Sequence, residues 1–191
     1  MSYQYYNPNG LKMKKLICLL PGVLILVTLL ACNNNKRPNN YNYNNDTVID
    51  ESGSIFIKQG LEAGLTEIKA AKVAETNSRN PRIIGFAKMM VADHTLAGDE
   101  LEKIGIKNRV SGGDSVSTAH QQMIAGLSSK LGIIFDAPYM QMMVNDHENA
   151  VKLFTRATQN KNAAIQNFAK KILPTLKMHL DSAKAIAASL K

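Results

Sequence analysis

The stretches FAKMMVADH at residues 86–94 and YMQMMVNDH at residues 139–147 share the pattern Met-Met-Val-x-Asp-His. In both stretches the apolar residues recur at intervals of three and four, which is the period of an amphipathic helix. Each stretch therefore lies within a helix that carries a histidine on its apolar face. The repetition predicts two helical hairpins related by an approximate twofold axis.

The same periodicity extends outward from these motifs and divides residues 54–191 into five helices. Gly and Pro punctuation places them at about 54–77, 80–106, 115–131, 136–159 and 162–190. None of the strong periodic segments alternates at two, so the predicted fold class is all-α. Four long helices and one short crossover helix predict an up-and-down four-helix bundle.

Local sequence signals set several of these boundaries. Asn80 and Pro81 supply an N-cap and a first-turn proline for the second helix. We expect Asp136 to cap the fourth helix, with Phe135 packing on Met140 as a hydrophobic staple. Pro174 lies within the fifth helix and predicts a kink there.

Residues 13–31 have the composition of a bacterial signal peptide. Two lysines precede an apolar run over residues 16–31, which at ~1.5 Å per residue is shorter than the ~30 Å hydrocarbon core. The run ends in LLAC at residues 29–32, which resembles the lipobox of bacterial lipoproteins. The resemblance implies acylation of Cys32 and anchoring in a membrane that the chain does not span. An ordinary secretory signal is the alternative.

Polar segments flank the signal peptide. Residues 1–12 do not fit a signal peptide, so we expect translation to start at Met13, with a cytoplasmic extension from Met1 as the alternative. Residues 32–53 are rich in Asn and lack apolar periodicity, which predicts a flexible tether. The predicted folded domain is therefore 54–191. We expect it in the cell envelope, at the outer membrane, facing the periplasm or the cell surface.

The net charge of the chain indicates which classes of binding partner are favoured. The chain has 23 Lys and Arg against 15 Asp and Glu, a net charge of +8 that falls to +5 without residues 1–31. Mild basicity outside the cytoplasm disfavours nucleic acid as a partner. It fits either an anionic envelope polymer or an ordinary solvated surface. The oligomeric state is not indicated. Because Cys18 leaves with the signal and Cys32 is acylated, no thiol is left for a disulfide or a zinc site.

Four side chains are candidate metal ligands. His94 and His147 come from the repeated motifs, and His179 lies on the apolar stripe of the fifth helix. Glu67 is the only charged residue on a face of small residues in the first helix. One carboxylate and three imidazoles facing inward from four helices is a composition from which bundle metal sites are built. The alternative is that each histidine is neutral and hydrogen-bonded in the core.

The heights of these residues along the bundle follow from residue counts. Glu67 precedes the turn between the first two predicted helices by nearly as many residues as His94 follows it, so the two residues should lie at one level. The repeat places His147 symmetrically to His94. His179 counts to a level ~7 Å away. We therefore expect it in a separate layer, contributing from there or through water.

The acids beside the motif histidines are candidate supporting residues. Asp93 and Asp146 each precede a histidine by one residue, so each points ~100° away from it. We expect them to contact a histidine on an adjacent helix, or else to be solvated. His120 has no matching partner in the pattern and is expected at the surface.

A transition ion is the cofactor that such a site implies, with copper, iron, zinc and manganese as candidates. Methionines 89, 90, 142, 143 and 178 lie beside the histidines, and thioethers with imidazoles would suit copper. Methionine at helical spacing, however, is more often a core residue.

The chain resembles the bacterial envelope family catalogued as domain of unknown function 4142. The resemblance rests on FAKMMVADHT at 86–95, FDAPYMQMMVNDH at 135–147, and FAKKILP at 168–174 followed by HLD at 179–181. It covers about 55–188 and implies a ferritin-like helical bundle, exported and often lipid-anchored, with no established activity. Glu67, His94, His147 and His179 fall on the recurrent polar positions of the family. Neither motif helix carries the Glu-x-x-His of di-iron ferritins, which disfavours di-iron oxidase chemistry.

Three functional hypotheses follow, and none assigns a catalytic residue. The first is a non-enzymatic, lipid-anchored envelope protein with a binding or stress-related role. The second is a protein that binds or stores a transition metal at the Glu/His cluster. The third is a weak metallo-oxidase. The sequence contains no nucleophile elbow, phosphate loop or His-Glu-x-x-His, so an enzyme is the less favoured class.

Cys32→Ser should abolish acylation, because no other residue of the lipobox can receive the lipid. Labelling cells with a clickable fatty acid measures this, and the variant should accumulate as an unprocessed or soluble form. Equal labelling of variant and wild type would contradict the lipoprotein interpretation.

Overall fold

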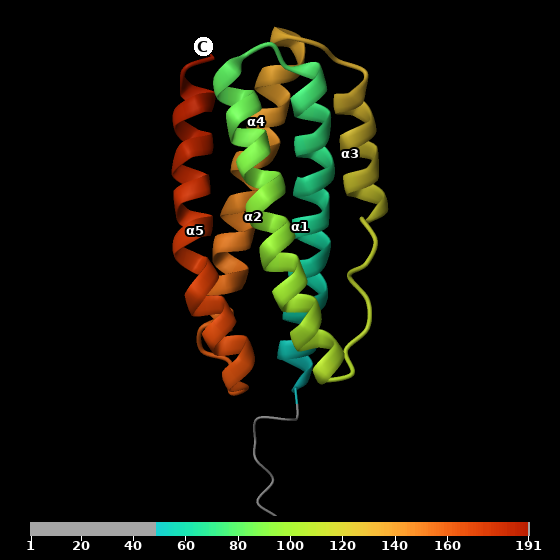
Figure 1. Ribbon diagram of the computed structural model, residues 1–191, viewed down its shortest axis with the longest axis vertical. Coiled ribbons are helices and arrows are strands. Elements are labelled where there is room, and N and C mark those ends of the chain that lie inside the picture. The colour runs from blue at the N-terminus through green and yellow to red at the C-terminus, as the bar shows by residue number, and fades with distance from the viewer. Residues whose placement is uncertain (1–48, 191) are drawn as a thin grey trace, which may run out of the picture. The chain divides into compact units, whose positions relative to one another are not determined.

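A computed structural model describes residues 49–190 as five helices, with no strand among these residues (Figure 1). The predicted signal peptide, Cys32 and most of the Asn-rich segment precede residue 49 and lie outside the described residues. The helices are α1 (Glu51–Asn77), α2 (Pro81–Lys107), α3 (Thr118–Ser128), α4 (Ile133–Ala157) and α5 (Ala163–Ala188). The all-α prediction is confirmed.

The four long helices form a bundle of two antiparallel hairpins, α1 with α2 and α4 with α5 (Figure 1). The hairpins pack through α1 against α4 and α2 against α5, so α2 and α4 lie diagonally across the bundle. The short helix α3 packs mainly on α1 and carries the chain from the end of α2 to the start of α4 (Figure 1). This is the predicted up-and-down bundle with a crossover helix.

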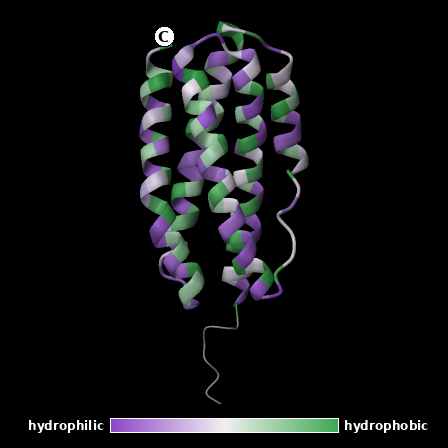
Figure 2. Ribbon diagram, viewed as in Figure 1, coloured by the Kyte–Doolittle hydropathy of each residue, from purple (hydrophilic) through white to green (hydrophobic). Residues whose placement is uncertain are grey.

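Each helix of residues 49–190 alternates hydrophobic and hydrophilic surface, as expected when one face is buried (Figure 2). None of them combines the length and apolarity needed to cross a lipid bilayer.

Buried apolar side chains form two clusters, named here by their positions in Figure 1. The upper cluster, near the α1–α2 turn, includes Phe86, Met90, Phe135, Tyr139 and Met143. The lower cluster, near the start of α1, is built around aromatic and aliphatic residues that include Phe56, Leu101, Phe154, Phe168 and Leu176. On every long helix, at least one buried polar residue lies between the parts that enter the two clusters.

The first helix begins earlier than predicted. Asp50 is its N-cap and accepts a hydrogen bond from the Gly53 amide at 2.8 Å. Glu51 lies in the first turn, where a negative charge is favourable to the helix dipole, and Ile49 packs on the lower cluster. Residues 49–53 therefore belong to the bundle, and the predicted tether boundary at residue 53 is wrong.

The fourth helix also begins earlier, and the prediction that Asp136 caps it is wrong. Gly132 occupies the cap position with a φ of 54° and makes no side-chain cap bond. A glycine adopts this left-handed conformation without steric cost, and the Gly132 amide donates to the Asn77 carbonyl at 2.8 Å. The chain can therefore enter the helix at Ile133.

Asp136 has a different partner. It is 4% exposed, and its Oδ1 accepts a hydrogen bond of 2.6 Å from Ser78 Oγ at the α1–α2 turn. Phe135 stacks on Tyr139 with ring centroids 5.3 Å apart and belongs to the same buried cluster as Met140. The Asp136 carboxylate therefore links α4 to the α1–α2 turn and does not cap the start of α4.

Other boundaries follow the sequence signals. Asn80 caps α2 by accepting from the Arg82 amide at 3.0 Å, with Pro81 in the first turn as predicted. Ser117 caps α3, which is shorter at both ends than the predicted 115–131. Helix α5 continues through Pro174, and the kink expected there stays a prediction.

Asp136→Ala should lower the free energy of unfolding by about 1–3 kcal/mol, because the buried Ser78 hydroxyl loses its acceptor. Urea unfolding followed by circular dichroism measures the change. Asp181→Ala, which removes an exposed carboxylate of α5, is the control and should change stability by less than about 0.5 kcal/mol. Equal stability of the two variants would show that the Ser78 contact contributes nothing.

Candidate metal centre

Each long helix contributes one side chain to a polar layer between the two apolar clusters. Glu67 comes from α1, His94 from α2, His147 from α4 and His179 from α5. Their exposed fractions are 2%, 7%, 0% and 1%. The structure thus brings together all four residues that the sequence analysis named as candidate ligands.

The three imidazoles lie at one level. The ring centroids are 5.5 Å apart for His94 and His147, 5.5 Å for His94 and His179, and 5.4 Å for His147 and His179. One ring nitrogen from each lies within 4.8 Å of the others. The prediction that His179 occupies a separate layer is therefore wrong. The residue count assumed that α4 and α5 start from a common level at their turn, whereas the meeting of the rings requires an offset between them.

Two of the histidines are oriented by hydrogen bonds from the outer side of the ring. His147 Nδ1 lies 2.9 Å from the Met143 carbonyl oxygen, which can only accept, so Nδ1 carries the proton. His179 Nε2 lies 2.9 Å from Asp93 Oδ2, so Nε2 donates to the carboxylate. In the neutral rings, the lone pairs of His147 Nε2 and His179 Nδ1 remain free. A histidine that donates its other N–H to a carbonyl or carboxylate is the usual form of a metal ligand.

The third histidine approaches the glutamate. His94 Nε2 is 2.8 Å from Glu67 Oε2, and His147 Nδ1 is 3.2 Å from Glu67 Oε1. The His94 contact has ion-pair distance without hydrogen-bond geometry, since His94 Nε2 has no hydrogen-bond partner among the described residues. Glu67 therefore lies beside two imidazoles, and each of these rings still has a nitrogen without a hydrogen-bond partner among the described residues.

Burial and charge act in opposite directions on this layer. Burial alone would raise the pKa of Glu67, but the imidazoles of His94 and His147 outweigh it and lower the pKa. Burial alone would lower the pKa of His94, but the adjacent Glu67 charge raises it. For His179, burial prevails over the Asp93 hydrogen bond and lowers the pKa to about 4. Burial also lowers the pKa of His147. At neutral pH, His147 and His179 are therefore uncharged and able to donate electron pairs.

Four buried polar atoms of the layer have no hydrogen-bond partner within the described part of the chain. They are Glu67 Oε1, His94 Nε2, His147 Nε2 and His179 Nδ1. Leaving one such atom unpaired costs about 1–3 kcal/mol, so a cluster of four requires an explanation. One ring nitrogen of each histidine lies within 4.8 Å of the others, so a cation shared by the three rings is one such explanation.

The two acids of the repeated motif have different environments. Asp93 contacts His179 on the adjacent helix, the kind of contact expected for it. Asp146 makes no hydrogen bond to a histidine within residues 49–190, contrary to that expectation, and its Oδ2 is buried without a partner. Burial, with a contribution from Glu67, raises the pKa of Asp146 to about 6.

His120 was expected at the surface, and its side chain is 26% exposed, but it is paired. Its Nδ1 is 2.7 Å from Glu62 Oε1 and 3.1 Å from Ser117 Oγ. Glu62 also accepts from the Ser117 amide at 2.9 Å, so this network docks the start of α3 on α1. Glu62 was not predicted as a partner of His120, because nothing in the linear pattern shows where a crossover helix docks.

The methionines beside the histidines are core residues for the most part. Met90, Met142 and Met143 belong to the upper cluster, Met89 packs against it, and Met178 is exposed. The core-filling interpretation fits these positions better than thioether ligation.

Fold and site together define a helical-bundle protein with a buried centre of three histidines and one glutamate. The sequence matches the family model described as "Domain of unknown function (DUF4142)" over residues 42–186, and the chain belongs to that family. No curated protein matches it. A solved structure with a similar fold is that of a DUF305 fragment from Deinococcus radiodurans, with a TM-score of 0.66 and 14% identity. The similarity covers 74% of this chain and 99% of that one, and it shows the fold alone.

Glu67→Gln should lower the pKa of His94 in the metal-free protein, because the charge that raises it is removed while burial remains. An NMR titration of the histidine ring protons measures the shift. Glu62→Gln, which removes the carboxylate beside His120, is the control and should leave the His94 titration unchanged. A His94 pKa that is the same in wild type and Glu67→Gln would contradict the assigned pairing.

Proposed function

We propose that the bundle binds one transition-metal ion per chain at His94, His147 and His179, with Glu67 as the adjacent carboxylate. We further propose that Cys32 anchors the protein by lipid in a bacterial envelope. The metal is a bound cargo or structural ion in this proposal, and no catalytic step is assigned to it.

The set of unpartnered ring nitrogens is the observation that supports metal binding. An ion pair of Glu67 with a protonated His94 would account for the first two residues. It would leave His147 Nε2 and His179 Nδ1 buried and unpaired, although both rings already have their outer nitrogens engaged. A metal ion accounts for all three rings and for the direction in which the His147 and His179 rings are held.

The ligand chemistry narrows the choice of ion. Imidazole nitrogens suit zinc, copper, iron and nickel, whereas manganese prefers carboxylate and water oxygens. Within residues 49–190 these histidines form the only group of three or more metal-ligating side chains close enough to share an ion. The site therefore supports a single ion rather than the pair of a di-iron oxidase.

The envelope location is supported by the sequence. The lipobox-like LLAC at residues 29–32 follows an apolar run with lysines before it. The polar, Asn-rich residues that follow could hold the bundle away from the membrane surface. A metal centre in this position would handle ions outside the cytoplasm.

Metal analysis of the purified, untagged protein after mild dialysis tests the proposal. We expect one ion per chain and a concentration-dependent rise in melting temperature with added zinc or copper, since an ion at 100 times its Kd stabilises by about 2.7 kcal/mol. His147→Ala and His179→Ala should lose this binding. The matched control is His120→Ala, which removes the fourth histidine of the chain, outside the cluster, and should bind as wild type does.

Asp93→Asn tests the support of His179. Loss of an outer-shell carboxylate typically costs about 10–100-fold in metal affinity, so this variant should bind one ion more weakly. Absence of bound metal, with no melting shift for any ion tested, would contradict the metal proposal and leave the histidines as core residues.

A further inference from the structure

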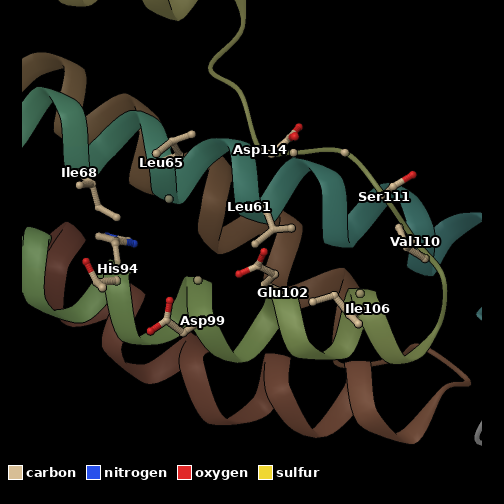
Figure 3. Close-up of a pocket in the computed structure, with 16 residues that line it drawn as sticks. Leu61, Leu65, Ile68, His94, Asp99, Glu102, Ile106, Val110, Ser111 and Asp114 are labelled. Carbon is tan, nitrogen blue, oxygen red and sulfur yellow. The ribbon is translucent and has the colours of Figure 1, made fainter.

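A cleft of about 480 Å³ lies between α1, α2 and the loop that follows α2 (Figure 3). Its wall is largely apolar, with Leu61, Leu65 and Ile68 from α1 and Ile106 and Val110 from the end of α2 and the loop. The His94 ring lies at one end of the cleft, between the two helices (Figure 3). The cleft therefore connects the molecular surface with one candidate ligand.

A second, internal cavity of about 30 Å³ adjoins the polar layer from below. Glu67 and His94 line it together with apolar residues of the lower cluster, among them Phe154 and Leu176. This volume suffices for one water molecule or a small ion. Gly64, His94 and Gly98 line both the cleft and the internal cavity, so the two spaces meet at these residues.

We infer that the α1–α2 cleft is the route by which a divalent cation reaches the histidine layer. This inference rests on the metal-binding function proposed above. His94 is the ligand that first meets the incoming ion, and Gly64 and Gly98 form the narrow passage beside it.

The other sides of the layer are less open. His147 and His179 are 0% and 1% exposed, and neither lines any of the cavities described here. A pocket of about 270 Å³ between α1 and α4 shares Ala63 and Ala150 with the internal cavity, but none of the three clustered histidines lines it. Of the two spaces that His94 lines, the α1–α2 cleft is the larger and the more open to the surface.

The charge of the cleft suits a cation. Asp99, Glu102 and Asp114 line it, and no lysine or arginine does. In Figure 3 the carboxylates of Asp99 and Glu102 project from α2 on the same side as His94. A low-dielectric groove lined by one sign of charge concentrates counter-ions and raises association rates by about 10–10³-fold.

The passage is open because Gly64 and Gly98, which line it, have no side chains. A Cβ at Gly98 would have no heavy atom within 4 Å, and one at Gly64 would meet only His94 Nδ1 at 4.0 Å. A larger side chain at residue 98 would therefore fill the passage without displacing a neighbouring residue. Gly85, on the same helix but outside the cleft lining, has equally open surroundings.

The test is the rate at which metal-free protein takes up Co²⁺, followed by stopped-flow absorption of the cobalt centre, beside the equilibrium stoichiometry. Gly98→Leu should slow uptake by about tenfold or more, the change produced by ~1.4 kcal/mol in the barrier, with one ion still bound at the end. The matched control Gly85→Leu places the same residue on the same helix and should load at the wild-type rate.

A second pair of measurements tests the acidic lining. The double variant Asp99→Asn/Glu102→Gln should load more slowly than wild type at low salt and approach the wild-type rate at high salt, where charges are screened. Its final stoichiometry should remain one ion.

The outcomes separate this inference from the function on which it rests. If Gly98→Leu and the double variant bind one Co²⁺ at the wild-type rate, the route is overturned and metal binding stands. If wild type binds no Co²⁺ and also no zinc or copper, the proposed function fails and the route with it. Slow uptake by Gly85→Leu as well as Gly98→Leu would attribute the delay to helix perturbation and overturn the route.

Discussion

A carboxylate buried at mid-height in the bundle constrains the elements around it. Glu67 is 2% exposed, and the groups within ion-pair distance of it are the imidazoles of His94 and His147. Because a buried charge without partners is costly, α2 and α4 must each turn a histidine toward α1. Helix α5 adds His179 at the same level, oriented by Asp93 of α2. One polar layer thus fixes the rotation and the relative height of all four long helices.

The layer also explains why the apolar core is divided. Above it, Phe86 lies beside His147 with ring centroids 6.5 Å apart, and methionines fill the space closely. Below it, Gly60, Gly64 and Gly98 leave the internal cavity beside Glu67 and His94. The side of the layer facing the lower cluster is therefore the side with room for an ion or water. The two apolar clusters supply most of the buried apolar surface, whereas the layer between them holds the buried ionisable groups Glu67, His94, His147 and His179.

Periodicity and capping signals were sufficient to predict the helices and the inward direction of Glu67, His94, His147 and His179. Both properties depend on local geometry, since the side-chain direction on a helix follows from residue spacing. What could not be predicted depends on contacts between helices. The height of His179 depends on the offset between α4 and α5, and the partner of His120 depends on where α3 docks. Asp136 illustrates the same limit, because its preference for an N-cap position competes with a buried hydroxyl 58 residues away in the chain.

The two aspartates of the repeated Asp-His motif, Asp93 on α2 and Asp146 on α4, have different environments. Asp93 faces an imidazole on α5, whereas Asp146 is partly buried, its Oδ2 has no hydrogen-bond partner within residues 49–190, and its pKa is raised. The carboxylates that contact the three rings are therefore two, Glu67 and Asp93, and together they carry two negative charges. Glu67 is 2% exposed, so its charge must be balanced within the interior, whereas the Asp93 side chain is 37% exposed and screened by water. A cation held by the imidazoles would therefore compensate mainly the buried Glu67 carboxylate, in addition to the selection that nitrogen ligands make among elements.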